Sequence, residues 1–176
     1  ATSWEVIEPT RWRFHLRKGV KFHNGNDFTA EDVVFSAERL NSEGSDMKGR
    51  VPVDATFEIV DDHTVDVILA SPNPILHYEW ELWSIIDKDW AEANDSMRVT
   101  SASDTAETTI SLKANGTGPF KISEHTSGVS TKFEANENWW NWDNREFNID
   151  TVNFTSISAD ATRVAALLSG ELDMVY

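Results

Sequence analysis

Apolar and polar residues alternate near the start of the chain, where Trp12, Phe14 and Leu16 are separated by arginine or histidine. An alternation with a period of two residues is typical of a β-strand with one buried face. The alternation resumes at Val20 after a Lys-Gly pair. The pattern therefore predicts a β-hairpin over residues 12–22.

A helix is predicted next, from Ala30 to Leu40. Thr29 is a favourable N-cap residue, and Asp32 follows it at the spacing of a capping box, with Asp in place of Glu. Phe28 precedes the cap and supplies one half of a hydrophobic staple. Helical spacing places these apolar side chains toward the core: Val33, Val34, Ala37 and Leu40.

Further elements follow in mixed order. A second hairpin is predicted over residues 57–69, a helix over the aromatic stretch 75–86, and a short acidic helix over 87–94. We expect strands at residues 120–122, 129–135, 152–157 and 173–176, and a helix at 159–169 that buries Val164, Ala165, Leu167 and Leu168.

The fold class follows from this order of elements. Hairpins and separate helices predict an α/β protein with mixed α+β organisation and a mixed sheet. The 176 residues suffice for a single domain with a sizeable core. Because the chain opens and closes within predicted strands, we expect it to be a piece of a longer protein.

Composition narrows the possible partners. The formal net charge of −15 disfavours nucleic acid and anionic membrane surfaces as partners. The chain has no cysteine, so disulfides and thiolate chemistry are excluded. No stretch approaches the roughly 18 consecutive apolar residues of a membrane span, so we expect no direct membrane insertion of this chain.

No catalytic or metal-binding constellation stands out, so we expect a protein that is not an enzyme and carries no metal or cofactor. The five histidines are scattered, and no serine lies in a nucleophile elbow. We expect a hydrogen-bonding role for His23 in preference to metal ligation. The segment Asn115–Pro119 lacks the residues of a phosphate-binding loop and predicts a turn with positive φ at glycine.

Eight tryptophans are unusually many for this length. We expect Trp4 and Trp12 to be core residues of strands. Tyr78 and Trp83 lie in an aromatic stretch that is richer than one buried helix face requires, which makes them candidates for a stacking surface.

Several segments together resemble the family 5 extracellular solute-binding proteins, the peptide-, oligopeptide- and nickel-binding receptors of bacterial ABC importers. The strongest resemblance lies in Trp12–Gly25 and Phe28–Ser36. Further segments resemble the family pattern in the same order: residues 61–65, 115–122, 136–140 and 161–174.

The resemblance implies a lobe like that of the type II periplasmic binding proteins. It implies that residues 1–176 form a single domain, part of the first lobe of a two-lobed receptor whose second lobe is absent. Such receptors are periplasmic or lipid-anchored on the outside of the cell. They close around a small solute, here expected to be a peptide, by hinge motion and deliver it to a membrane permease.

The positions that we expect to face the cleft and to bind the ligand are Met47, Tyr78, Trp83, Asn115, Thr117 and Tyr176. Two hypotheses from other classes stay open. The tryptophans and paired acids also suit a carbohydrate-binding module or a carbohydrate-active enzyme. An aromatic patch also suits a structural domain that docks a partner.

Overall fold

The computed structural model describes residues 1–52, 54–80, 83–100 and 108–175. The first part of the chain forms β1 (Ser3–Glu8), β2 (Arg11–His15), α1 (Ala30–Asn41), β3 (Thr56–Asp61), β4 (Thr64–Ile68), α2 (Leu76–Glu79), α3 (Lys88–Ala93) and α4 (Thr109–Leu112). The second part forms β5 (Phe120–Thr126), β6 (Ser130–Ala135), the 3-10 turn η1 (Trp142–Asn144), β7 (Thr151–Thr155) and α5 (Asp160–Ser169).

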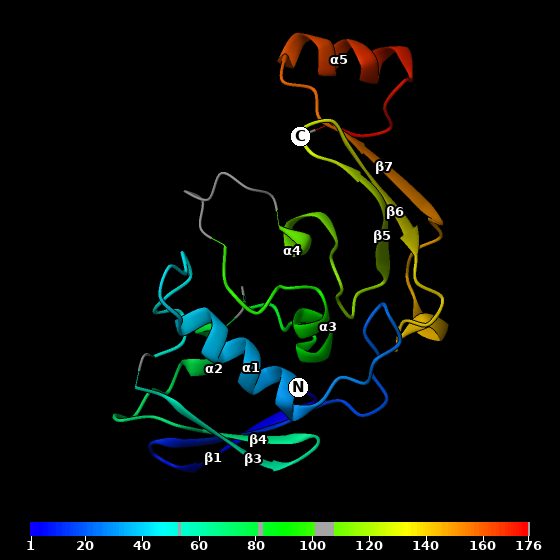
Figure 1. Ribbon diagram of the computed structural model, residues 1–176. Helices are drawn as coiled ribbons and strands as arrows, with labels where there is room; N and C mark the ends of the chain where they lie inside the picture. The colour runs from blue at the N-terminus through cyan, green and yellow to red at the C-terminus, as the bar shows by residue number, and fades with distance from the viewer. Residues whose placement is uncertain (53, 81–82, 101–107, 176) are drawn as a thin grey trace.

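The strands form two antiparallel sheets, which Figure 1 shows at opposite ends of the molecule. The first sheet has the order β1-β2-β4-β3, and α1 lies across one of its faces. The second sheet has the order β5-β6-β7, and α5 follows it at the far end of the molecule. The predicted mixed α/β class is confirmed, but the predicted mixed sheet is wrong, because every strand pair in the described residues is antiparallel.

The predicted hairpin over residues 12–22 is wrong. Strand β2 ends at His15 and pairs with β1 on one side and β4 on the other. Val20 and Phe22 are buried but lie in a loop, in which the N–H of Phe22 donates to the carbonyl of Asn26 at 2.9 Å. The alternation beyond β2 therefore reflects burial of loop side chains and not strand pairing.

Helix α1 begins where its cap predicts. The backbone N–H of Thr29 donates to Oδ2 of Asp32 at 2.8 Å, the reciprocal bond of a capping box. The other carboxylate oxygen of Asp32 accepts the N–H of Lys88 at 2.9 Å, so the cap also fastens α3 to α1. Val33 and Ala37 are buried as expected, whereas Val34 and Leu40 are half-buried.

The hairpin over residues 57–69 is confirmed by the pairing of β3 with β4, but the helix over 75–86 is much shorter than predicted. Helix α2 spans only Leu76–Glu79, and residues 83–87 belong to no helix or strand. The N–H of Ile86 donates to the hydroxyl of Ser36 at 2.8 Å and therefore makes no helical bond. A side chain of α1 thus overrides the helical pattern, while the short acidic helix is confirmed as α3.

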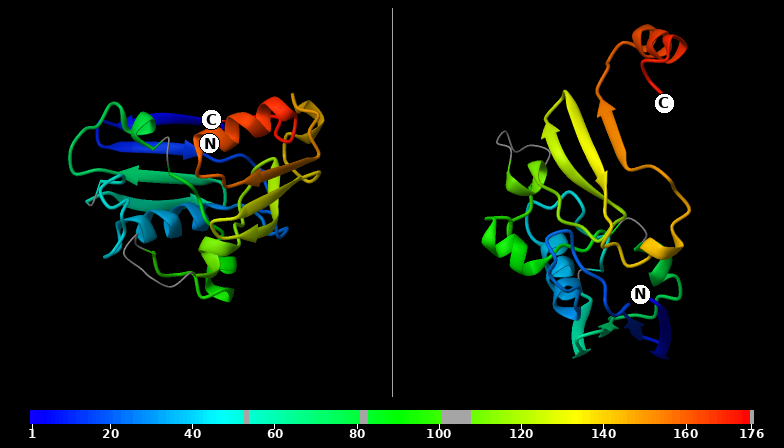
Figure 2. Two further views of the ribbon diagram at one scale, coloured as in Figure 1. Left: turned by 90° about the horizontal axis from the view of Figure 1, so that it is seen from above. Right: turned by 90° about the vertical axis from the view of Figure 1, so that its right-hand side faces the viewer.

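The second sheet and α5 form as predicted, but the expected burial in α5 is wrong. Leu168 is 82% exposed and Val164 52% exposed, and of the described residues of α5 only Ala166 is buried. Trp4 of β1, expected in the core, is 50% exposed. Figure 2 shows no described layer over α5, and Trp4 lies on β1, an edge strand of the first sheet, with its ring against that of His77. Residues 173–175 form no strand.

Candidate functional site

A concave surface of about 250 Å³ lies on the face of the first sheet that α1 only partly covers. Its floor is formed by strand residues that alternate toward this face, among them Trp4, Phe14 and Val65. Its wall is formed by His77 of α2 and by Trp80, Trp83 and Ile85, which follow that helix. We call it the aromatic hollow, and its aromatic members are Trp4, Phe14, Phe28, His77, Trp80 and Trp83.

Ring contacts fix the shape of the aromatic hollow. Phe14 stacks on Trp80 with ring centroids 5.4 Å apart, and Trp80 meets Trp83 edge to face at 4.9 Å. At the β1 side, Trp4 stacks on His77 at 5.1 Å. Offset and edge-to-face arrangements are the favourable geometries for such rings, so the wall is held rigidly over the sheet.

Several nitrogen atoms around the aromatic hollow are buried without a hydrogen-bond partner in the described part of the chain. They are Nε1 of Trp12, Trp80 and Trp83, and Nδ1 of His77. An indole N–H can only donate, and a buried donor left unpaired costs roughly 1–3 kcal/mol. These nitrogen atoms have almost no accessible surface, so the surface that the hollow offers to a ligand is mainly apolar and aromatic.

The lining of the aromatic hollow is poor in ionisable side chains. The described residues of the lining include no aspartate, glutamate, lysine or arginine. Over the same described ranges, no group of three or more histidine, cysteine, aspartate or glutamate side chains is placed to hold a metal. A hard cation needs carboxylate or carbonyl oxygens, which this surface does not offer.

A second concavity, of about 530 Å³, lies beside the N-terminus of α1 and is lined mainly by polar and acidic residues. Several of its ionisable groups are engaged in contacts within the fold. Lys88 pairs with Glu31 at 3.1 Å, and Asp32 caps α1. Burial raises the pKa of Asp32, although hydrogen bonds from the backbone of Lys88 and Thr29 oppose that shift. This region therefore serves the junction of α1 with α3.

The predicted site residues fall into separate places. Trp83 lines the aromatic hollow, and Tyr78, 72% exposed, lies next to it with its ring 4.0 Å from that of His77. Met47 is half-buried in the loop after α1, where its N–H donates to the hydroxyl of Ser45 at 3.2 Å. Met47 is not among the described residues of the hollow. Tyr176 lies outside the described residues.

Asn115 and Thr117 lie at the connection between the two sheets, away from the hollow lining. Oδ1 of Asn115 accepts the N–H of Asn24 at 3.1 Å, and its Nδ2 donates to the carboxylate of Asp87 at 2.9 Å. Both polar atoms of this amide are therefore bonded within the chain. The expected positive φ is wrong, because neither Gly116 nor Gly118 has one.

Of the aromatic members of the hollow, only Trp83 was predicted as a site residue; the five that were not are Trp4, Phe14, Phe28, His77 and Trp80. The alternation of β2 placed Phe14 on the apolar face, and this was the one available signal. His77 and Trp80 reach the hollow because the chain leaves α2 after one turn, and no sequence pattern indicated that.

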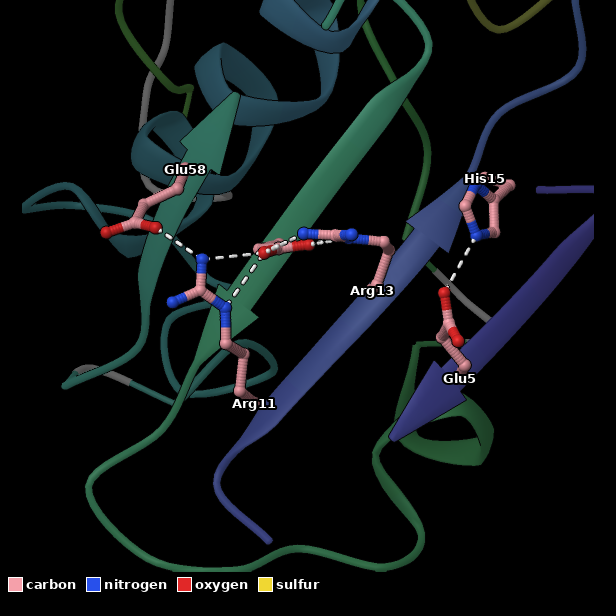
Figure 3. A network of polar contacts seen from close by, with 6 residues as sticks. Glu5, Arg11, Arg13, His15 and Glu58 are labelled. Carbon is pink, nitrogen blue, oxygen red and sulfur yellow. Dashed lines mark hydrogen bonds and ion pairs between the residues drawn. The ribbon is translucent and has the colours of Figure 1, made fainter. Parts of the chain in front are cut away.

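The opposite face of the first sheet is polar and serves stability. The carboxylate of Asp66 is fully buried beneath two guanidinium groups, with Nε of Arg13 at 2.6 Å and NH2 of Arg11 at 2.7 Å. Arg11 also reaches Glu58 at 2.7 Å, as Figure 3 shows. The hydrogen bond from Arg13, followed by that from Arg11, lowers the pKa of Asp66 although burial opposes the shift.

Comparison with known proteins identifies a family with a matching sequence and several similar proteins. The model of the bacterial extracellular solute-binding proteins, family 5 Middle, matches residues 1–176. The dipeptide-binding protein of Escherichia coli is 31% identical over 99% of this chain and 35% of its own length. Di/tripeptide-binding protein 1 of Pseudomonas aeruginosa is 30% identical over 97% of this chain and 34% of its own.

A solved structure agrees with the sequence comparison. The periplasmic binding protein DppA of Helicobacter pylori, in complex with the peptide STSA, superposes with a TM-score of 0.78 at 28% identity. The match covers 98% of this chain and 36% of that one. The chain thus spans about a third of the length of these relatives. In the described part of the chain, no helix has the length and apolar character needed to cross a membrane.

Proposed function

Because the chain belongs to the family 5 bacterial extracellular solute-binding proteins, we propose that it is part of the substrate-binding component of an ABC importer. In this role it captures a small solute and takes part in its delivery to a membrane permease. Members of the family are binding proteins and not enzymes, and the lining of the aromatic hollow supports the same assignment here.

Peptides are the proposed solute class. Two relatives carry dipeptides or di/tripeptides in their names, and the similar solved structure contains a bound peptide. The chemistry of the aromatic hollow carries the proposal for this chain. A peptide offers apolar or aromatic side chains that can stack on the rings of the hollow, among them Phe14, Trp80 and Trp83.

We propose that Trp83 and Tyr78 contact the solute, with Phe14, His77 and Trp80 completing the wall. We also keep four other positions as proposed cleft residues: Met47, Asn115, Thr117 and Tyr176. Asn115 would act indirectly, by holding the backbone N–H of Asn24. A wall of this size leaves much of a bound peptide in water, so strong binding requires a second wall.

The second wall is proposed to come from a second lobe. We propose that residues 1–176 form a single domain, part of the first lobe. The exposed apolar side chains of α5 and β7 support this proposal, because they form a face that further polypeptide would cover: Val152, Phe154, Val164, Leu167 and Leu168. The proposed location is the periplasm or the outer cell surface. One relative is named as a periplasmic oligopeptide-binding protein, which supports this location.

Native mass spectrometry tests the proposed function. The complete polypeptide that contains residues 1–176 is purified gently beside the 176-residue chain, and both are searched for a co-purified small molecule. A peptide-like mass on the complete polypeptide alone supports the proposal. A glycan mass, or glycan hydrolysis by the 176-residue chain, overturns it in favour of the carbohydrate-binding alternative.

A further inference from the structure

Residues 115–119, which we call the joint, lead directly into β5 of the second sheet and lie against the loop that follows β2 of the first sheet. On the side of the first sheet, the N–H of His23 donates to the carbonyl of Gly116 at 2.8 Å. On the side of the second sheet, Asn136 donates its side-chain N–H to the carbonyl of Gly118 at 3.0 Å and its backbone N–H to that of Pro119 at 2.7 Å. The joint is therefore held from both sides.

The ring of His23 lies at the centre of these contacts. Its Nδ1 accepts the N–H of Gly116 at 3.3 Å, and its Nε2 lies 3.1 Å from the carbonyl of Gly118. A carbonyl oxygen only accepts, so Nε2 must carry the proton and Nδ1 must be free of one. The two contacts together require the neutral imidazole.

Close packing accompanies these bonds. A Cβ atom at Gly116 would lie 3.7 Å from Cε1 of His23, so the ring rests directly against the backbone of the joint. The loop that carries His23 also carries Phe28, which lines the aromatic hollow and whose N–H donates to the carbonyl of Val20 at 3.0 Å. One loop thus links the hollow to the joint.

We propose that His23 is a positioning residue that fixes the angle between the two sheets only while its ring is neutral. Protonation at Nδ1 places an N–H of the ring against the N–H of Gly116. The hydrogen bond between them is lost, and the two donors repel each other. The angle between the sheets then varies more widely. The proposal does not depend on the identity of the solute or on transport.

Burial, together with a nearby lysine, favours the neutral ring of His23. Burial lowers the pKa of His23, the hydrogen bond to Gly118 opposes that shift, and Lys121 of β5 lowers the pKa further. From the N-cap of α3, the carboxylate of Asp87 faces the same region, where it accepts the side-chain N–H of Asn24 at 2.8 Å. Within the loop itself, Lys21 and Asp27 pair with each other at 2.7 Å.

A second contact between the sheets limits how far they can separate. The guanidinium of Arg17 lies over the ring of Trp140 at 4.0 Å, and arginine stays charged across the relevant pH range. Because this contact does not titrate, release of His23 is expected to widen the range of angles without separating the sheets.

Distance measurements between spin labels test the proposal, because the chain has no cysteine that would compete for the label. Glu8→Cys and Ser127→Cys place labels at exposed positions of the first and second sheets. We expect a narrow distance distribution at pH 8 and a broader one at pH 5. The circular dichroism spectrum is expected to be the same at both pH values, which shows that the secondary structure persists. The midpoint is expected below the ordinary histidine pKa of about 6.5.

Variants assign the change to one residue. In His23→Gln the distribution is expected to be the same at both pH values, because glutamine does not titrate. In the control His125→Gln the pH dependence is expected to persist, since the exposed ring of His125 bonds only to Thr131 among the described residues. Broadening that survives in His23→Gln, or that disappears in His125→Gln, overturns the proposal.

Nitrogen NMR of the unsubstituted ring provides a test that does not require the variant to fold. At pH 8, Nδ1 of His23 is expected to give the signal of an unprotonated nitrogen, and its titration is expected to coincide with the broadening. A protonated Nδ1 at pH 8, or a titration that is separate from the distance change, contradicts the proposal.

Discussion

The side-chain nitrogen of Asn115 donates a hydrogen bond of 2.9 Å to the carboxylate of Asp87 and so joins the connection between the sheets to the start of α3. The same oxygen accepts side-chain N–H groups of Asn24 at 2.8 Å and Asn26 at 2.9 Å. The other oxygen accepts the N–H of Trp90 at 2.9 Å. One buried carboxylate thus organises three segments of the chain.

Replacing Asp87 is therefore expected to destabilise the fold. Asp87→Ala leaves three amide side chains and one backbone N–H without their acceptor, and we expect a loss of about 3 kcal/mol in the free energy of unfolding. Urea unfolding followed by circular dichroism measures it. The control Asp89→Asn alters an exposed neighbour and is expected to change stability by less than about 0.5 kcal/mol. Equal effects of the two variants would contradict this account of Asp87.

The ion cluster of the first sheet predicts a dependence of stability on pH. The pKa of Asp66 is lowered by Arg13 and Arg11, so its contribution is complete above the ordinary aspartate pKa of about 3.9. That contribution is lost as the pH falls through the lowered value. We expect the free energy of unfolding to decrease on acidification below about pH 4, with a smaller decrease in Asp66→Asn.

The magnitude is limited by solvent. Both arginine side chains stay 30% exposed and keep part of their hydration when Asp66 is neutralised. We therefore expect Asp66→Asn to cost only about 1–2 kcal/mol at pH 7. Asp62→Asn, in the exposed turn of the same hairpin, is the matched control and should leave the acid limb of the profile unchanged. If both variants show the same reduced loss of stability on acidification, Asp66 is not the cause of that loss.

The exposed face of α5 predicts association of the 176-residue chain. Leu168→Glu removes an 82% exposed side chain, so the free energy of unfolding is expected to change by less than about 0.5 kcal/mol. Sedimentation velocity at increasing protein concentration is expected to show less self-association than in the unsubstituted chain. Ala166→Glu, at the buried position of the same helix, is expected to disrupt α5. Unchanged self-association in Leu168→Glu would show that this face of α5 does not mediate it.

Local signals predicted much of the fold. The capping pair Thr29 and Asp32 fixed the start of α1, and the alternation at residues 57–69 identified a hairpin whose two strands are adjacent in the chain. The prediction of a helix over 75–86 was wrong because the hydroxyl of Ser36, 50 residues away, accepts the N–H of Ile86 that a helix would use. Contacts of that separation leave no periodic trace in the sequence.

Burial and the site were harder to predict for a related reason. A pattern shows that Trp4 and Leu168 belong to apolar faces, but it does not show whether the chain contains the layer that covers them. Trp83 was found because the stretch around it carries more aromatic residues than one helix face needs. Its neighbours Phe14 and Trp80 meet only after β2 and the stretch beyond α2 are folded together.

The central claim is that the aromatic hollow binds the solute, and calorimetric titration with di- and tripeptides tests it most directly. The complete polypeptide that contains residues 1–176 is titrated unsubstituted, as Trp83→Ala, and as the control Trp142→Ala, whose ring stacks under Arg145 away from the hollow. We expect Trp83→Ala to weaken binding at least about tenfold, which corresponds to about 1.4 kcal/mol, and Trp142→Ala to bind normally. Peptide binding that is unchanged in a folded Trp83→Ala protein would contradict the claim.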